Sequence, residues 1–289
     1  MLAWWGTSWS SSFEKLKLYV NRVDAVYELL YEQSTDRYHV ERNTPVYRST
    51  RNVYRDIAAD PKNKSIYLLE KQTFSHSYVT LLRKNQSNQF IYVNSLKLGH
   101  DSFSMDLAYL DDSSDPCLIT KDLDHFHCSV VSPNKVSELS FEISNEKENL
   151  ESMGDIVQVD SHHFLSTEKK IIGGFTSTLL RIYRYEPERE VFVMEKEYDL
   201  KKEFQISASS NFYVPGVMIH VVKNQLTNLP THRLLLITHS GLMYISSLLF
   251  DKSGDLSSIR FDPKIKQHTG LYDCQGATSE IVCPFCHLE

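Results

Sequence analysis

The sequence predicts a mainly β protein built from short antiparallel meanders, and three observations support this. Short apolar runs recur from about Ser65 onward and are separated by turns rich in Gly, Pro, Asn and Asp. Residues 232–261 read as three strands joined by two tight turns, the first of them at Ser240-Gly241. The chain also contains 16 Tyr and 14 Phe, which favour pleated, half-buried surfaces.

The strand groups recur at a regular spacing. They cover residues 65–96, 117–143, 156–198 and 204–261, and they begin about 40 to 50 residues apart. Small sheets repeated at that interval bury their faces against one another, as the blades of a β-propeller do. We therefore expect propeller-like stacked meanders, as a partial ring or as four blades, with a β-sandwich as the alternative. In this rhythm, residues 60–262 resemble WD-repeat-like propeller proteins, and the resemblance implies a role in protein–protein interaction.

The N-terminal segment has a different pattern. Ser11 and Glu14 have the spacing of a capping box, and apolar residues then recur at steps of three and four. This predicts an amphipathic helix over residues 12–31. Its apolar stripe either packs on its own domain or lies in the groove of a partner protein. The candidate partner-binding residues are Phe13, Leu16, Val20, Val23 and Tyr27.

The expected organisation has three parts. Residues 1–62 hold the helix and a polar connection, residues 63–264 form the β domain, and residues 265–289 form a tail that contains cysteines.

Composition narrows the class of protein. Of the 289 residues, 41% are hydrophobic and 24% are charged, and the net charge is −6, as in a soluble globular protein. The acidic balance does not favour a nucleic-acid binder, and no apolar run approaches the roughly 20 residues of a membrane helix. We expect no secretory signal, reduced thiols for the five cysteines, and an intracellular location in the cytoplasm or nucleus.

The tail carries the sharpest local motif. Cys283-Pro284-Phe285-Cys286 resembles one knuckle of a zinc ribbon, in which a tight turn directs two thiolates at one metal. Four ligands are needed, and Cys274 and His268 would complete the set for Zn. The alternative is that these cysteines are thiols without a metal.

Two histidine pairs are candidates for chemistry. In a strand, His125 and His127 would share one face, as metal-binding pairs do. His162 and His163 follow Asp160, which would suit a general base or a metal ligand. The alternative for both pairs is a strand edge with a structural role.

No motif indicates a catalytic centre, so the sequence favours a non-catalytic scaffold or adaptor subunit that binds other proteins, and not an enzyme. One alternative is a metal-dependent hydrolase that uses the histidine pairs. Another is a nucleic-acid-associated factor with a zinc knuckle in its tail.

Overall fold

The computed structural model describes residues 17–40, 45–49, 53–71, 77–110, 117–122, 125–132, 135–144, 152–224, 227 and 229–279. Regular structure in these ranges is almost entirely β strand. None of the helices in these ranges has the length and apolar character needed to cross a membrane.

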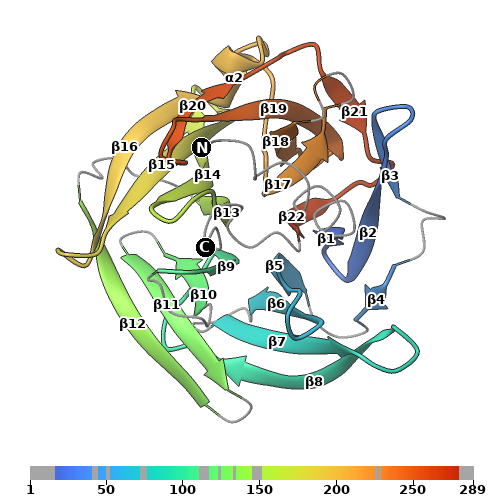
Figure 1. Cartoon of the computed structure of the whole chain (residues 1–289), viewed down its shortest axis with the longest axis vertical. Coiled ribbons are helices and arrows are strands. Elements are labelled where there is room, and N and C mark those ends of the chain that lie inside the picture. The colour runs from blue at the N-terminus through green and yellow to red at the C-terminus, as the bar shows by residue number, and fades with distance from the viewer. Residues whose placement is uncertain are drawn as a thin grey trace.

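The described strands form five four-stranded units arranged around a centre, and we call these units blades 1 to 5 (Figure 1). Blade 1 contains β22 (Cys274–Ser279), β1 (Leu18–Arg22), β2 (Ala25–Glu32) and β3 (Arg37–Val40), with the short β4 (Tyr47–Arg48) beside β2. Blade 2 contains β5 (Tyr54–Asp60), β6 (Ser65–Lys71), β7 (Ser77–Lys84) and β8 (Phe90–Lys97). The fold is therefore a β-propeller.

Blades 3 and 4 share one sheet. Blade 3 contains β9 (Ser104–Ala108), β10 (Cys117–Lys121), β11 (His125–Ser132) and β12 (Lys135–Ser144). Blade 4 contains β13 (Ser152–Gln158), β14 (His163–Ile172), β15 (Phe175–Glu186) and β16 (Val191–Asp199). The outer strands β12 and β16 pair in parallel and so join the two blades. Blade 5 contains β17 (Gly216–Lys223), β18 (Pro230–Ile237), β19 (Leu242–Phe250) and β20 (Leu256–Arg260), and β21 (Lys266–His268) also pairs with β19. A single turn of helix, α2 (Leu200–Glu203), precedes blade 5.

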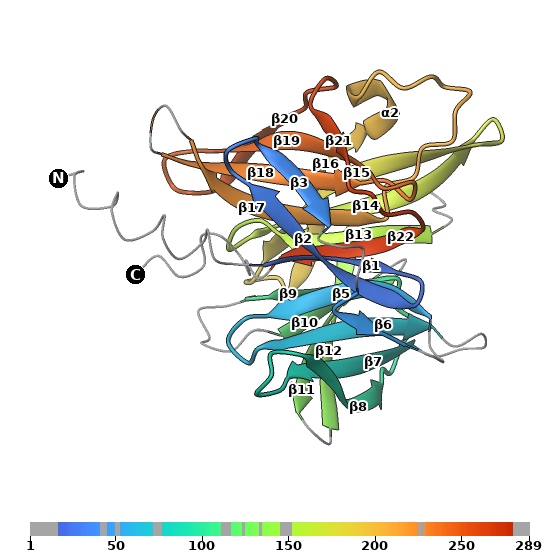
Figure 2. The same ribbon diagram turned by 90° about the vertical axis from the view of Figure 1, so that its right-hand side faces the viewer.

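The last strand closes the ring. Strand β22 pairs antiparallel with β1, so that Gly276 lies opposite Asn21 and Ala277 lies opposite Val20. Figure 2 shows these two strands side by side, although more than 250 residues separate them in the chain. The segments 1–62 and 265–289 therefore contribute strands to one sheet.

The apolar core lies between the blades. Each of the five buried clusters joins residues from two neighbouring blades, and together the clusters fill all five interfaces of the ring. Strand β18 shows how this works, because Leu234 and Leu236 face blade 4 whereas Leu235 and Ile237 face blade 1. A strand that is buried on both faces reads as a continuous apolar run, which is why the sequence pattern identified these strands.

The sequence predicted the mainly β, propeller-like fold correctly, but the number of blades and the N-terminal helix were wrong. The described part of residues 12–31 forms β1 and β2, with Val23 at the turn between them. Val20 and Tyr27 face each other across this strand pair and pack into the core between blades 1 and 5. Because this segment was predicted as a helix, the predicted number of blades was one too low. Phe13 and Leu16 lie outside the described residues.

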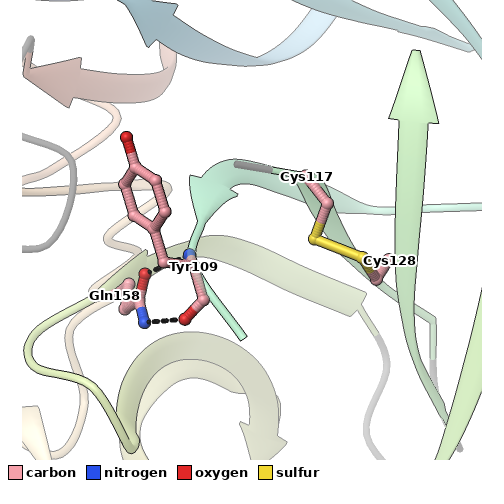
Figure 3. Close-up of a disulfide and its surroundings, with 4 residues drawn as sticks. All are labelled: Tyr109, Cys117, Cys128 and Gln158. Carbon is pink, nitrogen blue, oxygen red and sulfur yellow. Dashed lines mark hydrogen bonds between the residues drawn. A yellow bond between two sulfur atoms is a disulfide. The ribbon is translucent and has the colours of Figure 1, made fainter. Parts of the chain in front are cut away.

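A disulfide joins Cys117 of β10 to Cys128 of β11 (Figure 3). The prediction of reduced thiols is therefore wrong for these two residues. Nearby, Gln158 of β13 donates to the carbonyl of Tyr109 and accepts from its amide N–H, each at 2.8 Å, so its side chain connects blades 3 and 4 (Figure 3).

Candidate functional site

A cavity of about 360 Å³ lies between blades 1 and 5. Residues at the start of β1, along β2 and at the end of β17 form its walls. They are Lys17, Leu18, Glu28, Leu29, Leu30, Tyr31, Gln33, His220, Val221, Val222 and Lys223. The cavity has a lining that is about equally polar and apolar, and its size lies within the range of small-molecule sites.

Three aromatic side chains from three strands meet at one wall of this cavity. Tyr31 of β2 lies 4.8 Å from Tyr38 of β3 and 5.0 Å from His220 of β17, measured between ring centroids. Tyr38 and His220 are buried, whereas Tyr31 is partly exposed. The edge-to-face contacts around His220 fix the plane of its ring.

A chain of hydrogen bonds sets the orientation of His220. Arg233 donates to both carboxylate oxygens of Asp36, at 2.6 and 3.2 Å. The same guanidinium donates to the hydroxyl of Tyr38 at 3.3 Å, and that hydroxyl lies 2.8 Å from Nδ1 of His220. Since Arg233 can only donate, the Tyr38 oxygen accepts from it, and the Tyr38 hydrogen is free to point at Nδ1. We assign the Tyr38 hydroxyl as the donor in this contact and Nδ1 as the acceptor.

The protonation states agree with this assignment. Burial, together with the nearby charge of Arg233, lowers the pKa of His220 to about 3. His220 is therefore neutral at pH 7, and with Nδ1 accepting, its hydrogen is on Nε2. Burial by itself would raise the pKa of Asp36, but hydrogen bonds from Arg233 and Tyr31 hold it below its usual value. Burial raises the pKa of Tyr31 to about 12, so that side chain stays a neutral phenol.

The charges around the cavity are unequal. Lys17 forms an ion pair with Glu28, with Nζ 2.6 Å from one carboxylate oxygen. Lys223 at the end of β17 contributes a second ammonium group. Two lysines and one glutamate give the cavity a net positive lining, which favours an anionic ligand.

This arrangement can bind and polarise an oxygen atom. A neutral imidazole that presents Nε2–H is a hydrogen-bond donor at pH 7 and carries no charge that must be desolvated. A carbonyl or carboxylate oxygen placed next to it would accept that hydrogen bond, while the lysines would compensate negative charge on the ligand.

A second cluster lies between blades 4 and 5. Asp160 accepts from the amides of His162 and His163 and from the amide of Leu256 in blade 5, at 2.7 to 2.9 Å. Both of its carboxylate oxygens lie 2.9 Å from Nδ1 of His163. With Asp255, these two side chains place three ligand atoms within 4.8 Å of one another, which could hold a metal ion. Of the predicted pair, His163 is buried in this cluster and His162 is exposed.

The electrostatics of the second cluster also fit an ion pair. Burial by itself would raise the pKa of Asp160 and lower that of His163, but their contact outweighs burial in both. The pKa of Asp160 is therefore lowered and that of His163 is raised. Nε2 of His163 lies 3.4 Å from Glu195, so the imidazolium is held between two carboxylates.

The other histidine pair lies as expected, on one face of β11, with ring centroids 5.9 Å apart. Nε2 of His127 lies 2.9 Å from Asp122, and the ring of His127 stacks on His100 at 3.5 Å. The nearest Asp122 oxygen is 3.8 Å from Nδ1 of His125. The arrangement is a stacked cluster in blade 3, with His127 buried and His100 and His125 partly exposed.

The predicted zinc ligands are only partly described. Cys274 is buried in the core between blades 1 and 5, and burial raises the pKa of its thiol to about 12, which disfavours the thiolate that zinc needs. His268 lies in β21, where its Nδ1 accepts from the amide of Gly270. Cys283 and Cys286 lie outside the described residues, so the four-residue site stays a prediction.

Sequence reasoning missed the residues of the blade 1 and blade 5 cavity. His220 stands in the apolar run Val217–Val222 and reads as an ordinary buried strand residue. Asp36 stands in a polar turn and Arg233 at the start of another apolar run. The single local signal is the one histidine within that apolar run, because a buried imidazole needs a hydrogen-bond partner.

No protein-family model matches this sequence, and no curated protein resembles it in sequence. Solved structures do resemble it. The β-propeller domain of Nup133 from Vanderwaltozyma polyspora aligns with a TM-score of 0.47 at 11% identity, covering 89% of this chain and 77% of that one. A Bacteroides fragilis protein and a Bacteroides uniformis protein, both provisionally identified as 6-phosphogluconolactonases, each align with a TM-score of 0.44. Their identities are 9% and 8%, and the alignments cover 93% and 92% of this chain and 99% of each of theirs.

These similarities agree with the propeller fold but transfer no activity to this chain. They also correct the predicted function. The sequence led to a non-catalytic scaffold because the fold was taken to lack a reactive centre, yet two of the similar structures have been given an enzymatic identification. The inference from fold to absence of catalysis is therefore wrong, because function depends on the site that a fold carries. The resemblance of the tail to a zinc-ribbon knuckle finds no support in these comparisons.

Proposed function

We propose that this propeller binds a small organic anion in the cavity between blades 1 and 5, and that the ligand presents a carboxylate or carbonyl oxygen to Nε2–H of His220. The observation that carries the proposal is the hydrogen-bond chain from Asp36 through Arg233 and Tyr38, which leaves a neutral imidazole with its hydrogen on Nε2.

The size of the cavity sets the size of the ligand. At about 360 Å³ it lies near the lower end of the range of roughly 300 to 1,000 Å³ that small-molecule sites span. It therefore suits a metabolite and excludes a folded macromolecule. The apolar walls from Leu29 and Val222 suit a short carbon skeleton between the polar ends.

The position of the charges sets the class of ligand. Lys17 already forms an ion pair with Glu28, whereas Lys223 has no ion-pair partner in the described part of the chain. A ligand carboxylate can therefore pair with Lys223 without displacing an existing ion pair. A cationic ligand would meet two ammonium groups and one carboxylate, which is unfavourable.

The experiment is isothermal titration calorimetry of the purified chain with a panel of mono-, di- and tricarboxylates of about two to eight carbons. We expect at least one member to bind with a stoichiometry of one. His220→Phe keeps the ring volume and removes the donor. Loss of one neutral hydrogen bond, about 0.5 to 1.5 kcal/mol, should weaken that binding roughly two- to thirteenfold.

Two matched variants separate the cavity from general effects. His232→Phe changes another histidine whose pKa burial lowers, and this half-buried residue lies outside the cavity lining, so binding should not change. Lys223→Met should weaken binding and reduce its dependence on salt, whereas Lys252→Met on the exposed turn between β19 and β20 should do neither. If no carboxylate binds the wild-type chain, or if His220→Phe binds as well as His232→Phe, the proposal is wrong.

A further inference from the structure

Carboxyl groups from three inner strands meet at the centre of the ring. Asp56 of β5, Asp106 of β9 and Asp155 of β13 each stand directly before an apolar residue, and all three are buried. In the other two inner strands, β17 and β22, a glycine stands directly before an apolar residue, Gly216 before Val217 and Gly276 before Ala277. Figure 1 shows these five strands around the centre.

Each carboxylate binds a backbone amide of another blade. Asp56 accepts from the amide of Met105 at 2.7 Å, and Asp106 accepts from the amide of Gln158 at 3.3 Å. Asp155 accepts from two amides, those of Val217 at 2.7 Å and Ala277 at 3.1 Å. Since β13 and β22 are not neighbours in the ring, Asp155 reaches across the centre.

Two of these carboxyl groups also contact each other. The side chains of Asp56 and Asp155 are within hydrogen-bonding reach, and both residues are 0% exposed. Burial raises the pKa of both well above the usual value, and the charge of Asp155 raises that of Asp56 further. Among the described residues, no Lys, Arg or His forms an ion pair with either one. Backbone amides donate to all four oxygens, but two adjacent buried negative charges are still costly, so this pair needs a proton or a cation.

A third buried polar side chain, that of Asn21, lies near these two carboxyl groups. Asn21 of β1 is 0% exposed, and neither its Oδ1 nor its Nδ2 has a hydrogen-bond partner. Gly276 lies opposite it in the strand pair. A Cβ atom on Gly276 would come within 2.3 Å of Oδ1 of Asp56 and 2.8 Å of Oδ1 of Asn21. The missing side chain of Gly276 therefore makes room for two acceptor oxygens that converge.

We propose that Asp56, Asp155 and Asn21 bind one divalent cation, Ca²⁺ or Mg²⁺, at the centre of the ring. Carboxylate and amide oxygens are the ligands that these hard cations prefer. A cation would compensate both carboxylates and use the Asn21 oxygen, whereas a shared proton would compensate one carboxylate and leave that oxygen unused. The bound ion would tie blade 1 to blades 2 and 4, across the point where the two ends of the chain close the ring.

The test combines elemental analysis with thermal unfolding of the purified full chain in EDTA, in Ca²⁺ and in Mg²⁺. We expect about one bound Ca²⁺ or Mg²⁺ per chain. A cation at a hundredfold its Kd should raise the Tm by roughly 5 to 10 °C above the Tm in EDTA. Whichever of the two ions restores the Tm at the lower concentration is the preferred ligand.

Variants assign the ion to this place. Asn21→Leu keeps every bond from a carboxylate to a backbone amide, so it should fold in EDTA as the wild type does and bind the cation at least tenfold more weakly. Asp155→Asn should lose the ion. Asp106→Asn is the matched control, because it also weakens a bond between blades but leaves the proposed ligands in place, and it should keep the ion.

Asp255→Asn tests the other possible metal site, the cluster of Asp160 and His163. It should keep the ion as well. The proposal is overturned if the chain holds no metal and its Tm is the same in EDTA, Ca²⁺ and Mg²⁺. It is also overturned if Asn21→Leu binds the ion as tightly as the wild type, or if Asp255→Asn is the variant that loses it.

Discussion

Replacing Glu168 by glutamine should destabilise the ring at the interface of blades 3 and 4. Glu168 is 0% exposed and lies between two buried cations, with Nζ of Lys121 at 3.3 Å and a terminal nitrogen of Arg181 at 2.8 Å. The hydroxyl of Tyr183 donates to the same carboxylate at 2.7 Å. Glutamine keeps the size and one acceptor but removes the charge. Arg181 would then keep its pair with Glu197, and Lys121 would lose its ion pair with Glu168.

The expected magnitude follows from burial. Removing one partner of a buried ion pair costs roughly 3 to 5 kcal/mol, because the remaining charge stays in a poorly solvated place. Since Tyr183 can still donate to the amide oxygen of glutamine, we expect the low end, about 3 kcal/mol. An exposed pair gives the comparison. Arg48 and Asp24 are 3.1 Å apart with about half of each side chain exposed, so Asp24→Asn should cost less than about 1 kcal/mol.

The assay is urea unfolding of both variants and the wild type, monitored by far-UV circular dichroism. For an m value of about 3 kcal/mol/M, Glu168→Gln should lower the midpoint by about 1 M, and Asp24→Asn by a third of that or less. Equal midpoints for the two variants would refute the reasoning, as would a Glu168→Gln protein that is more stable than the wild type.

Three further predictions concern the ring. Ending the chain before Cys274 removes β22, so the shortened protein should lose its cooperative thermal transition. Addition of a synthetic β22 peptide should restore that transition. A cooperative transition without the peptide would contradict closure of the ring by β22. The stability lost in His163→Gln should be greatest near pH 5.5. The difference in unfolding free energy between the wild type and the variant should become smaller as pH rises through the raised pKa of His163, and also as pH falls through the lowered pKa of Asp160. Urea unfolding from pH 3 to 9 would measure it. A difference that does not change with pH would contradict the ion pair. Replacing Cys117 and Cys128 by serine should lower the free energy of unfolding by about 2 to 3 kcal/mol and abolish the effect of dithiothreitol on the Tm. A wild-type Tm that does not change when dithiothreitol is added would contradict the disulfide.

The sequence pattern identified the strands that pair with strands close to them in the sequence. From β6 to β20, with the exception of β9, which the pattern missed, apolar runs and turns such as Ser240-Gly241 are encoded by neighbouring residues, because a meander folds back on itself. The first blade has no such signal. Strand β1 is buried on both faces, so Leu18, Tyr19 and Val20 show no alternation, and its inner partner β22 lies at the other end of the chain. Helical spacing in this segment was therefore a coincidence.

The candidate sites were predicted where their residues are adjacent in sequence and missed where they are not. Asp160 and His163 lie three residues apart, and they do meet. The cavity needs Asp36, His220 and Arg233, which tertiary pairing brings together from blades 1 and 5.

The carboxylates at the centre of the ring did leave a signal in the sequence. Asp56-Ile57-Ala58 is followed by Asp106-Leu107-Ala108 and Asp155-Ile156-Val157, which are successive repeats of one acidic residue before two apolar ones. This pattern marks the inner strands of blades 2, 3 and 4, and an aspartate repeated at the blade interval within buried strands points to a shared location at the centre of the ring.

The most direct test of the account is the protonation state of His220. Long-range ¹H–¹⁵N spectra of the chain labelled at histidine, assigned by comparison with His220→Phe, report which ring nitrogen carries hydrogen. We predict a neutral ring with hydrogen on Nε2 from pH 5 to 8, because its pKa is about 3. The Nε2 signal should shift when a carboxylate binds. A ring that titrates near pH 6.5, or one that carries its hydrogen on Nδ1, would contradict the proposed site.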